Sequence, residues 1–227
     1  MTFAGFDRAA LALLADLPEF DASTFAEQRA VLTTGLVKPG TSLIHEVAER
    51  LDAGLTVVPR SSVSPLHTDL RFAAPGAARY KDHLLLTTWH GPDKKAAPTL
   101  WIRINATSVG FASGTPFAPE IRDRWRRAIA GPRGASLTRS IDALLKAHRK
   151  HSVEVAGDQL KKVPPPWDDD HPRAELLRRT AFQIRFRERA PASLVKPSFA
   201  EWCAERLRQL LPVHRWLVAE LASRGTK

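Results

Sequence analysis

The stretch GDQLKKVPPPWDDDHPRAELLRRTAFQIRF, residues Gly157–Phe186, decides the fold because it changes from a turn to a helix and then to a strand. Pro164–Pro166 fix φ and lack amide hydrogens, so this part is extended and cannot lie at the centre of a sheet. Asp168–Asp170 precede Pro172, an order typical of a helix N-terminus, where carboxylates cap free amides and meet the positive end of the helix dipole. We expect this helix to run to about Arg179.

The end of the same stretch predicts a β-strand. Phe182, Ile184 and Phe186 alternate with polar residues, which gives one apolar and one basic face. Apolar spacing elsewhere predicts helices after Asp7, at 24–36, from Thr41, at 121–129, at 137–145, after Phe199 and after Pro212. Strands are expected at 56–58, 70–72 and 84–86 and in a hairpin of 100–104 with 109–111. These patterns predict an α+β fold, a mainly antiparallel sheet packed by N- and C-terminal helices, as a single domain over residues 1–227.

The net charge of +10 is unevenly distributed along the 227 residues. Residues 1–114 contain 11 Lys and Arg against 11 Asp and Glu, whereas the rest of the chain contains 23 against 13. Such an asymmetry indicates a polyanionic partner, nucleic acid included. The alternative is a generally basic surface, since arginines outnumber lysines by 24 to 10, as codon bias in a GC-rich genome would produce.

Several classes of protein are disfavoured. Cys203 is the only cysteine, so an internal disulfide framework is excluded, and its apolar helical neighbours predict a buried thiol. No apolar run reaches the length of a membrane span and no signal pattern begins the chain, so we expect a cytoplasmic protein without a membrane partner. Dinucleotide, phosphate-loop and nucleophile-elbow motifs do not occur, and no cofactor is expected.

Metal binding has two candidate segments, and both have a simpler interpretation. His45 and Glu46 begin a zincin-like pattern, but Glu49 stands where the second histidine would be needed. Asp168–Asp170 with His171 could supply oxygen and imidazole ligands, although helix capping explains the same residues. We therefore expect no metal.

Several segments together resemble the bacterial domain-of-unknown-function family 2461. They are residues 3–6, 11–17, Phe25, 69–72, 80–81, 109–131 and 158–177, and the last contains the Leu-Lys-x-x-Pro-x-x-x-Asp-x-Asp-His-Pro pattern, the most specific of them. The resemblance covers nearly the whole chain and implies the fold and a candidate site, while the family has no assigned activity. Pro18–Asp21 and Ala73–Gly76 depart from the family pattern, and the second departure removes two lysines and an acid.

The candidate site combines residues from two of these segments. Arg71, Tyr80 and Lys81 offer a planar donor fork, a hydroxyl and a point charge, which suit an anionic ligand together with Lys161 and Lys162. The alternative is that Asp69 pairs with Arg71 and fixes a loop. We expect Asp69 and His171 as acid–base candidates if a reaction is catalysed.

A second candidate is one face of the sheet. If the strands of Trp101 and Phe182 share a sheet, one face collects Trp101, Arg103, Gln183, Arg185 and Arg187. Arginines beside an aromatic ring are typical of surfaces that hold single-stranded nucleic acid, whereas an ordinary covered or solvated face is the alternative. The leading hypothesis is an anion-binding module for a phosphorylated ligand or nucleic acid. An enzyme acting on a small phosphorylated or carboxylated substrate and a protein-interaction scaffold are the alternatives.

Overall fold

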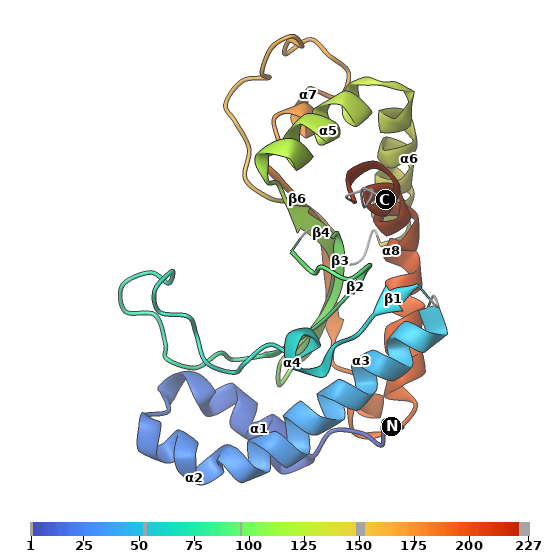
Figure 1. Cartoon of the computed structure of the whole chain (residues 1–227). Helices are drawn as coiled ribbons and strands as arrows, with labels where there is room; N and C mark the ends of the chain where they lie inside the picture. Colours follow the sequence, from blue (N-terminus) through green and yellow to red (C-terminus); the bar gives the residue numbers. More distant parts are fainter. Residues whose placement is uncertain (1, 52–53, 96, 149–152, 223–227) are drawn as a thin grey trace. The chain divides into compact units, whose positions relative to one another are not determined.

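The computed structural model describes residues 2–51, 54–95, 97–148 and 153–222. One six-stranded antiparallel sheet has the strand order β1-β2-β3-β4-β6-β5, and helices precede and follow it along the chain (Figure 1). The strands are β1 Leu55–Thr56, β2 Leu84–His90, β3 Thr99–Ile104, β4 Ser108–Pro116, β5 Glu154–Ala156 and β6 Ala181–Arg189. The predicted α+β class is confirmed.

Alternation within the strands has the predicted period. In β3 the side chains of Leu100, Ile102 and Ile104 are buried while those between them are half-buried. In β6, Phe182 and Ile184 are likewise buried, and the intervening polar residues are more exposed. The predicted hairpin joins β3 to β4. Strands β3 and β6 belong to the same sheet, which was the condition for the predicted Arg-rich face.

Contacts within the chain group the residues into two compact units, and each is described by itself. Unit 1 consists of Met1–Thr88, Trp101–Gly110 and Glu188–Arg206, and unit 2 consists of Trp89–Leu100, Phe111–Arg187 and Leu207–Lys227. The single domain over residues 1–227 stays a prediction. Within the described ranges, no helix combines the length and the apolarity that crossing a membrane requires.

Unit 1 begins with three helices, α1 Arg8–Asp16, α2 Ala22–Leu32 and α3 Lys38–Leu51. Asp7 caps α1 as predicted, because its carboxylate accepts the amide of Ala10 at 2.9 Å. The sequence predicted a break between the second and third helices, but a π-helical turn at Thr33–Val37 connects them. This wider turn lies just before Pro39, which lacks the amide hydrogen that an uninterrupted α-helix needs.

The N-terminal segment of unit 1 is fixed by aromatic packing. The rings of Phe3 and Phe6 lie against Phe199, with ring centroids 6.1 and 6.2 Å from its centroid. Gly5 lies between them at φ 114°, and a Cβ there would come within 2.5 Å of the Val195 backbone. Only glycine fits both the backbone angle and this close approach.

The segment between α4 Pro59–Ser62 and β2 in unit 1 is a long loop (Figure 1). The strand predicted at residues 70–72 does not form. Leu70 and Arg71 lie in a turn instead, where the amide of Phe72 donates to the carbonyl oxygen of Asp69 at 3.2 Å. Three residues of strand-like composition have too little apolar burial to hold an extended conformation without a neighbouring strand.

Unit 2 contains α5 Pro119–Ala130, α6 Pro132–Ala147 and the short α7 Ala174–Leu177. Helices α5 and α6 pack together and meet at Gly131, near α7 (Figure 1). Trp125 of α5 is fully buried among the rings of Phe117, Phe182 and Trp216, with centroids 5.0 to 5.7 Å away. This aromatic core explains why α5 keeps its apolar stripe inside and leaves its arginines around it.

The C-terminal helix differs from its prediction. The sequence predicted two helices separated at Pro212, whereas the structure has a single helix, α8 Phe199–Leu221, with Pro212 inside it. A proline within a helix costs about 3 kcal/mol. Leu207, Leu210 and Leu217 are buried before and after it, and each buried leucine contributes about 1.5–3 kcal/mol. Burial of the continuous stripe therefore outweighs the missing hydrogen bond.

Candidate functional site

Arg122 and Arg126 of α5 form a crowded pair of cations in unit 2. They are one helical turn apart and flank the buried Trp125, so both side chains are partly buried. The Nε atom of each is inaccessible to solvent, and no described residue accepts a hydrogen bond from it. A buried donor without an acceptor is costly, and such an atom in a native structure points to a missing ligand or solvent molecule.

The electrostatic environment of this pair is unfavourable for two positive charges. Burial is the largest cause that lowers the pKa of Arg126 from its ordinary value, and the nearby charge of Arg122 lowers it further. The charge of Asp123 opposes both effects without cancelling them. A bound anion would relieve this repulsion, because it would add an opposite charge and supply hydrogen-bond acceptors.

A third arginine, Arg173 just before α7, reaches the C-terminal end of α5. Arg173 donates to the carbonyl oxygen of Ile129 at 2.6 Å, and the indole Nε1 of Trp125 donates to the carbonyl oxygen of Leu176 at 2.7 Å. The segment therefore runs from the C-terminal end of α5 back toward its beginning.

Arg178 has the same unsatisfied donor as the pair on α5. Its Nε is buried and lacks a hydrogen-bond acceptor among the described residues, while its Nη1 lies 3.9 Å from Oδ1 of Asp169. At that distance, and with both side chains partly exposed, the ion pair neutralises Arg178 only weakly. Arg178 directly follows α7, which packs against α5, and we call Arg122, Arg126 and Arg178, which share a buried Nε without an acceptor, the arginine cluster.

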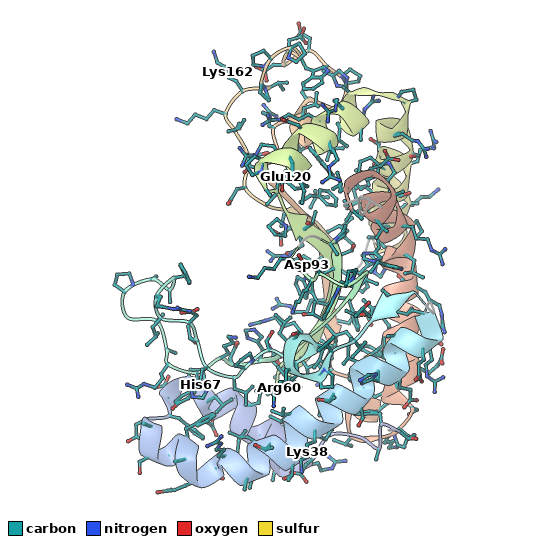
Figure 2. All side chains as sticks on the ribbon, viewed as in Figure 1. Lys38, Arg60, His67, Asp93, Glu120 and Lys162 are labelled. Carbon is teal, nitrogen blue, oxygen red and sulfur yellow. The ribbon has the colours of Figure 1, made fainter. Side chains whose placement is uncertain are left out.

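The loop between β5 and α7 supplies the predicted lysines (Figure 2). Lys162 is labelled on this loop, and Glu120 marks the beginning of α5. The carboxylate of Asp169 accepts the amide of Val163 at 3.1 Å, which closes the proline turn between them. Lys161 and Lys162 are exposed beside this closure. The turn thus presents both lysines next to the carboxylate that approaches Arg178.

The acidic run in this loop does not cap a helix, so that prediction was wrong. Arg173 occupies the position before α7, and no side chain caps the helix there. Asp168 instead accepts the amide of Asp170 at 3.1 Å, and Asp169 is used by Val163. The aspartates lie too early in the chain, because the turn at His171–Arg173 intervenes before α7 begins.

His171, the acid–base candidate of unit 2, has a defined tautomer. Its Nδ1 accepts the backbone amide of Arg173 at 3.0 Å. An accepting Nδ1 carries no proton, so the neutral ring carries its proton on Nε2. His171 therefore offers a neutral hydrogen-bond donor in the same loop as the lysines.

The predicted residues of unit 1 already have partners within the chain. Arg71 donates through Nε and Nη2 to both oxygens of Asp69 at 2.9 and 2.8 Å, the alternative interpretation that the sequence left open. The Arg71 hydrogen bond is the largest cause that lowers the pKa of Asp69. The ammonium of Lys81 donates to the carbonyl oxygen of Pro65 at 2.8 Å, and burial lowers its pKa.

Tyr80 is a packing residue in this structure. Its ring is 3% exposed and is stacked on Phe25, with 4.2 Å between the centroids and 3° between the planes. The imidazole of His67 meets both rings edge-on at 4.8 and 4.9 Å. We call Phe25, His67 and Tyr80 the aromatic cluster, and it fixes the base of the long loop.

Two of the three arginines predicted on the sheet face, Arg103 and Arg185, are also paired with carboxylates. Arg103 donates to Asp82 at 2.8 Å and contacts the imidazole of His83 at 3.0 Å. Arg185 donates to Glu154, which lies opposite it in the β5–β6 register, at 2.9 Å. These cations are therefore partly neutralised, unlike those of the arginine cluster.

Sequence reasoning singled out the loop between β5 and α7 but did not single out Arg122, Arg126 and Arg178, and its site residues stay a prediction. Lys161, Lys162 and His171 lie in that loop, whereas Asp69, Arg71, Tyr80, Lys81 and Arg103 belong to unit 1, and Arg185 lies on β6 of unit 2. The signal for Arg122 and Arg126 was their helical spacing around a buried tryptophan. Within the described part of the chain, no group of three or more His, Cys, Asp or Glu side chains could hold a metal ion.

Comparison with known proteins gives one match. The family model of the conserved hypothetical protein DUF2461 matches residues 20–216 of this chain. No curated protein matches it. No solved structure matches it either.

Proposed function

We propose that this chain, which belongs to the DUF2461 family of conserved hypothetical proteins, is an anion-binding module whose site in unit 2 is the arginine cluster. The observation that carries the proposal is that three of the four described arginines with a buried Nε lacking an acceptor belong to the cluster, while the fourth, Arg179, donates through its other nitrogens to Gly157 and Glu175. The sequence already indicated a polyanionic partner, because all of the net charge of +10 comes from residues after Gly114.

The chemistry of the site favours a phosphate group over a carboxylate. Arginine forks match the oxygens of phosphate, and several guanidinium groups can share its charge. Lys161 and Lys162 add exposed point charges from the neighbouring loop, and the Nε2 hydrogen of His171 adds a neutral donor. The carboxylate of Asp169 lies 3.9 Å from Arg178. At that distance it would compete only weakly with a bound anion for the guanidinium.

The cytoplasm is the compartment that we propose for this activity. Cys203 is a free, fully buried thiol, and burial raises its pKa well above the ordinary value. A buried, protonated thiol needs no oxidising compartment.

The test is a phosphate titration followed by thermal unfolding at constant ionic strength. At a phosphate concentration about 100 times the dissociation constant, binding to the folded state stabilises it by about 2.7 kcal/mol. For a chain of this size that corresponds to a rise in melting temperature of roughly 5–10 °C. The double variant Arg122→Gln/Arg126→Gln is expected to lose this rise while melting no lower than wild type without phosphate, since it removes a repulsion.

A matched control is available on the same helix. Arg127 is exposed, so Arg127→Gln changes the net charge of α5 without touching the arginine cluster. We expect this variant to keep the full response to phosphate. If the double variant also keeps it, or if chloride at the same ionic strength gives the same rise, the arginine cluster is not a phosphate site.

A further inference from the structure

The long loop of unit 1 is fixed at its base and ends in an exposed tip (Figure 1). The amide of Thr68 donates to the carbonyl oxygen of Arg79 at 2.9 Å, and the amide of Lys81 donates to that of Leu66 at 2.8 Å. The aromatic cluster lies at the same base, where His67 and Tyr80 form an isolated antiparallel bridge. Residues 69–79 therefore project from a base in which residues 66–68 pair with residues 79–81.

The tip of this loop exposes apolar side chains that a folded chain ordinarily buries. Phe72 is 85% exposed and Leu70 is 53% exposed, the largest values among the exposed large hydrophobic side chains of the described residues. The turn is held by Asp69, whose carboxylate accepts from both the backbone and the side chain of Arg71. The Arg71 guanidinium lies 5.5 Å from the centre of the Phe72 ring.

This combination has a defined chemistry. The solvent-exposed ring of Phe72 can stack on another aromatic ring, and the guanidinium of Arg71 adds a positive charge beside the stack. Arg71, Arg79 and Lys81 bring three cations to the loop, whereas Asp69 is the single carboxylate among residues 69–81. The ligand that fits is one that alternates flat rings with negative charges.

We propose that this tip is a stacking platform for single-stranded nucleic acid, with a base on Phe72 and flanking phosphates on Arg79 and on Arg71, whose exposed ion pair with Asp69 is weak enough for a phosphate to replace. Single strands present unpaired bases that stack on aromatic side chains irrespective of sequence, and their phosphates bind nearby arginines. The fixed base of the loop limits the conformational entropy that binding costs. The platform lies in unit 1 and does not depend on the arginine cluster of unit 2.

The experiment measures the fluorescence anisotropy of labelled oligothymidylate and oligouridylate of about 12 nucleotides, a length within the range that such sites cover. At low salt, roughly 50 mM, Phe72→Ala and Phe72→Leu are each expected to weaken binding about tenfold, as loss of one stacked base does. Leu70→Ala is the matched control, because it removes exposed apolar surface from the same turn, and it is expected to bind like wild type. Both residues are exposed, so none of these substitutions should change the melting temperature.

The dependence on salt tests the phosphate contacts separately. Each contact to a single strand contributes about −0.7 to the slope of log affinity against log salt, so Arg79→Gln should reduce the slope by about that amount. An oligonucleotide that does not bind wild type overturns the proposal. So does a Phe72→Leu variant that binds as tightly as wild type, since an apolar contact with a protein or lipid would tolerate leucine. The phosphate-induced rise in melting temperature should be the same in all Phe72 variants. A negative result for oligonucleotide binding therefore does not bear on the proposed phosphate site at the arginine cluster.

Discussion

Arg173 connects α7 to the end of α5, and its removal is expected to loosen the part of unit 2 that carries the arginine cluster. Its Nε donates to the carbonyl oxygen of Ile129 at 2.6 Å, and its Nη2 donates to those of Ala130 and Gly131 at 3.0 and 3.2 Å. These carbonyls lie at the C-terminal end of α5, where the helix dipole favours a positive charge.

The magnitude follows from counting donors. Nη2 is shared between two acceptors, so we count two effective hydrogen bonds, and a bond that involves a charged group contributes about 1.5–3 kcal/mol. Arg173 is only partly buried, which places each bond at the lower end of that range. Arg173→Ala should therefore lower the free energy of unfolding by about 3 kcal/mol. Arg173→Lys keeps the charge but not the planar fork, and we expect roughly half that loss.

The assay is urea denaturation followed by circular dichroism and tryptophan fluorescence. Arg139→Ala, an exposed arginine of α6, serves as the control for loss of one positive charge. A surface change of that kind alters stability by less than about 0.5 kcal/mol. If Arg173→Ala and Arg139→Ala have the same midpoint and slope, Arg173 does not hold α7 against α5.

Three further predictions concern unit 1. Gly5→Ala should destabilise the protein by about 1–3 kcal/mol in chemical denaturation, because a Cβ would meet the Val195 backbone and φ is 114°. Burial is the largest cause that lowers the pKa of His83 below 6.5. The contribution of His83 to stability is therefore complete above about pH 6.5 and is lost as the pH falls through the pKa of the folded state. In melting experiments at several pH values, His83→Gln should flatten that decline. Asn105→Ala should cost about 1 kcal/mol in the same denaturation assay, because its Oδ1 accepts two amides of the β3–β4 turn.

Sequence reasoning succeeded where a local pattern is buried on one side. The alternation in β3 and β6 and the cap at Asp7 need only the residues next to them, and each formed as predicted. Sequence reasoning failed where contacts between residues distant in the chain determine where a helix begins or ends. The π turn before Pro39 and the uninterrupted α8 depend on burial of stripes whose neighbours lie elsewhere in the chain. Local apolar spacing before Thr41 and the proline rule at Pro212 therefore gave the wrong helix boundaries.

Long-range contacts also determine which cations of the predicted site are neutralised by a carboxylate. Sequence composition identifies cations but cannot tell which of them have a carboxylate nearby. Arg103 is paired with Asp82, 21 residues away, and Arg185 is paired with Glu154, 31 residues away. Both were predicted ligand residues, and both lose much of their attraction for an external anion through these pairs.

The arginine cluster illustrates the opposite outcome. In the sequence Arg122 and Arg126 look like an ordinary solvated helix face, but in the structure their Nε atoms are buried on the helix against which α7 packs. That packing depends on the Trp125 indole and on Arg173, neither of which belongs to the cluster. Residues that order α7 should therefore control anion affinity without contacting the anion. Arg173→Lys is expected to weaken phosphate binding more than Arg127→Gln does, although both substitutions lie outside the cluster and the first retains its charge. Equal affinities in the two variants would show that the cluster forms without α7.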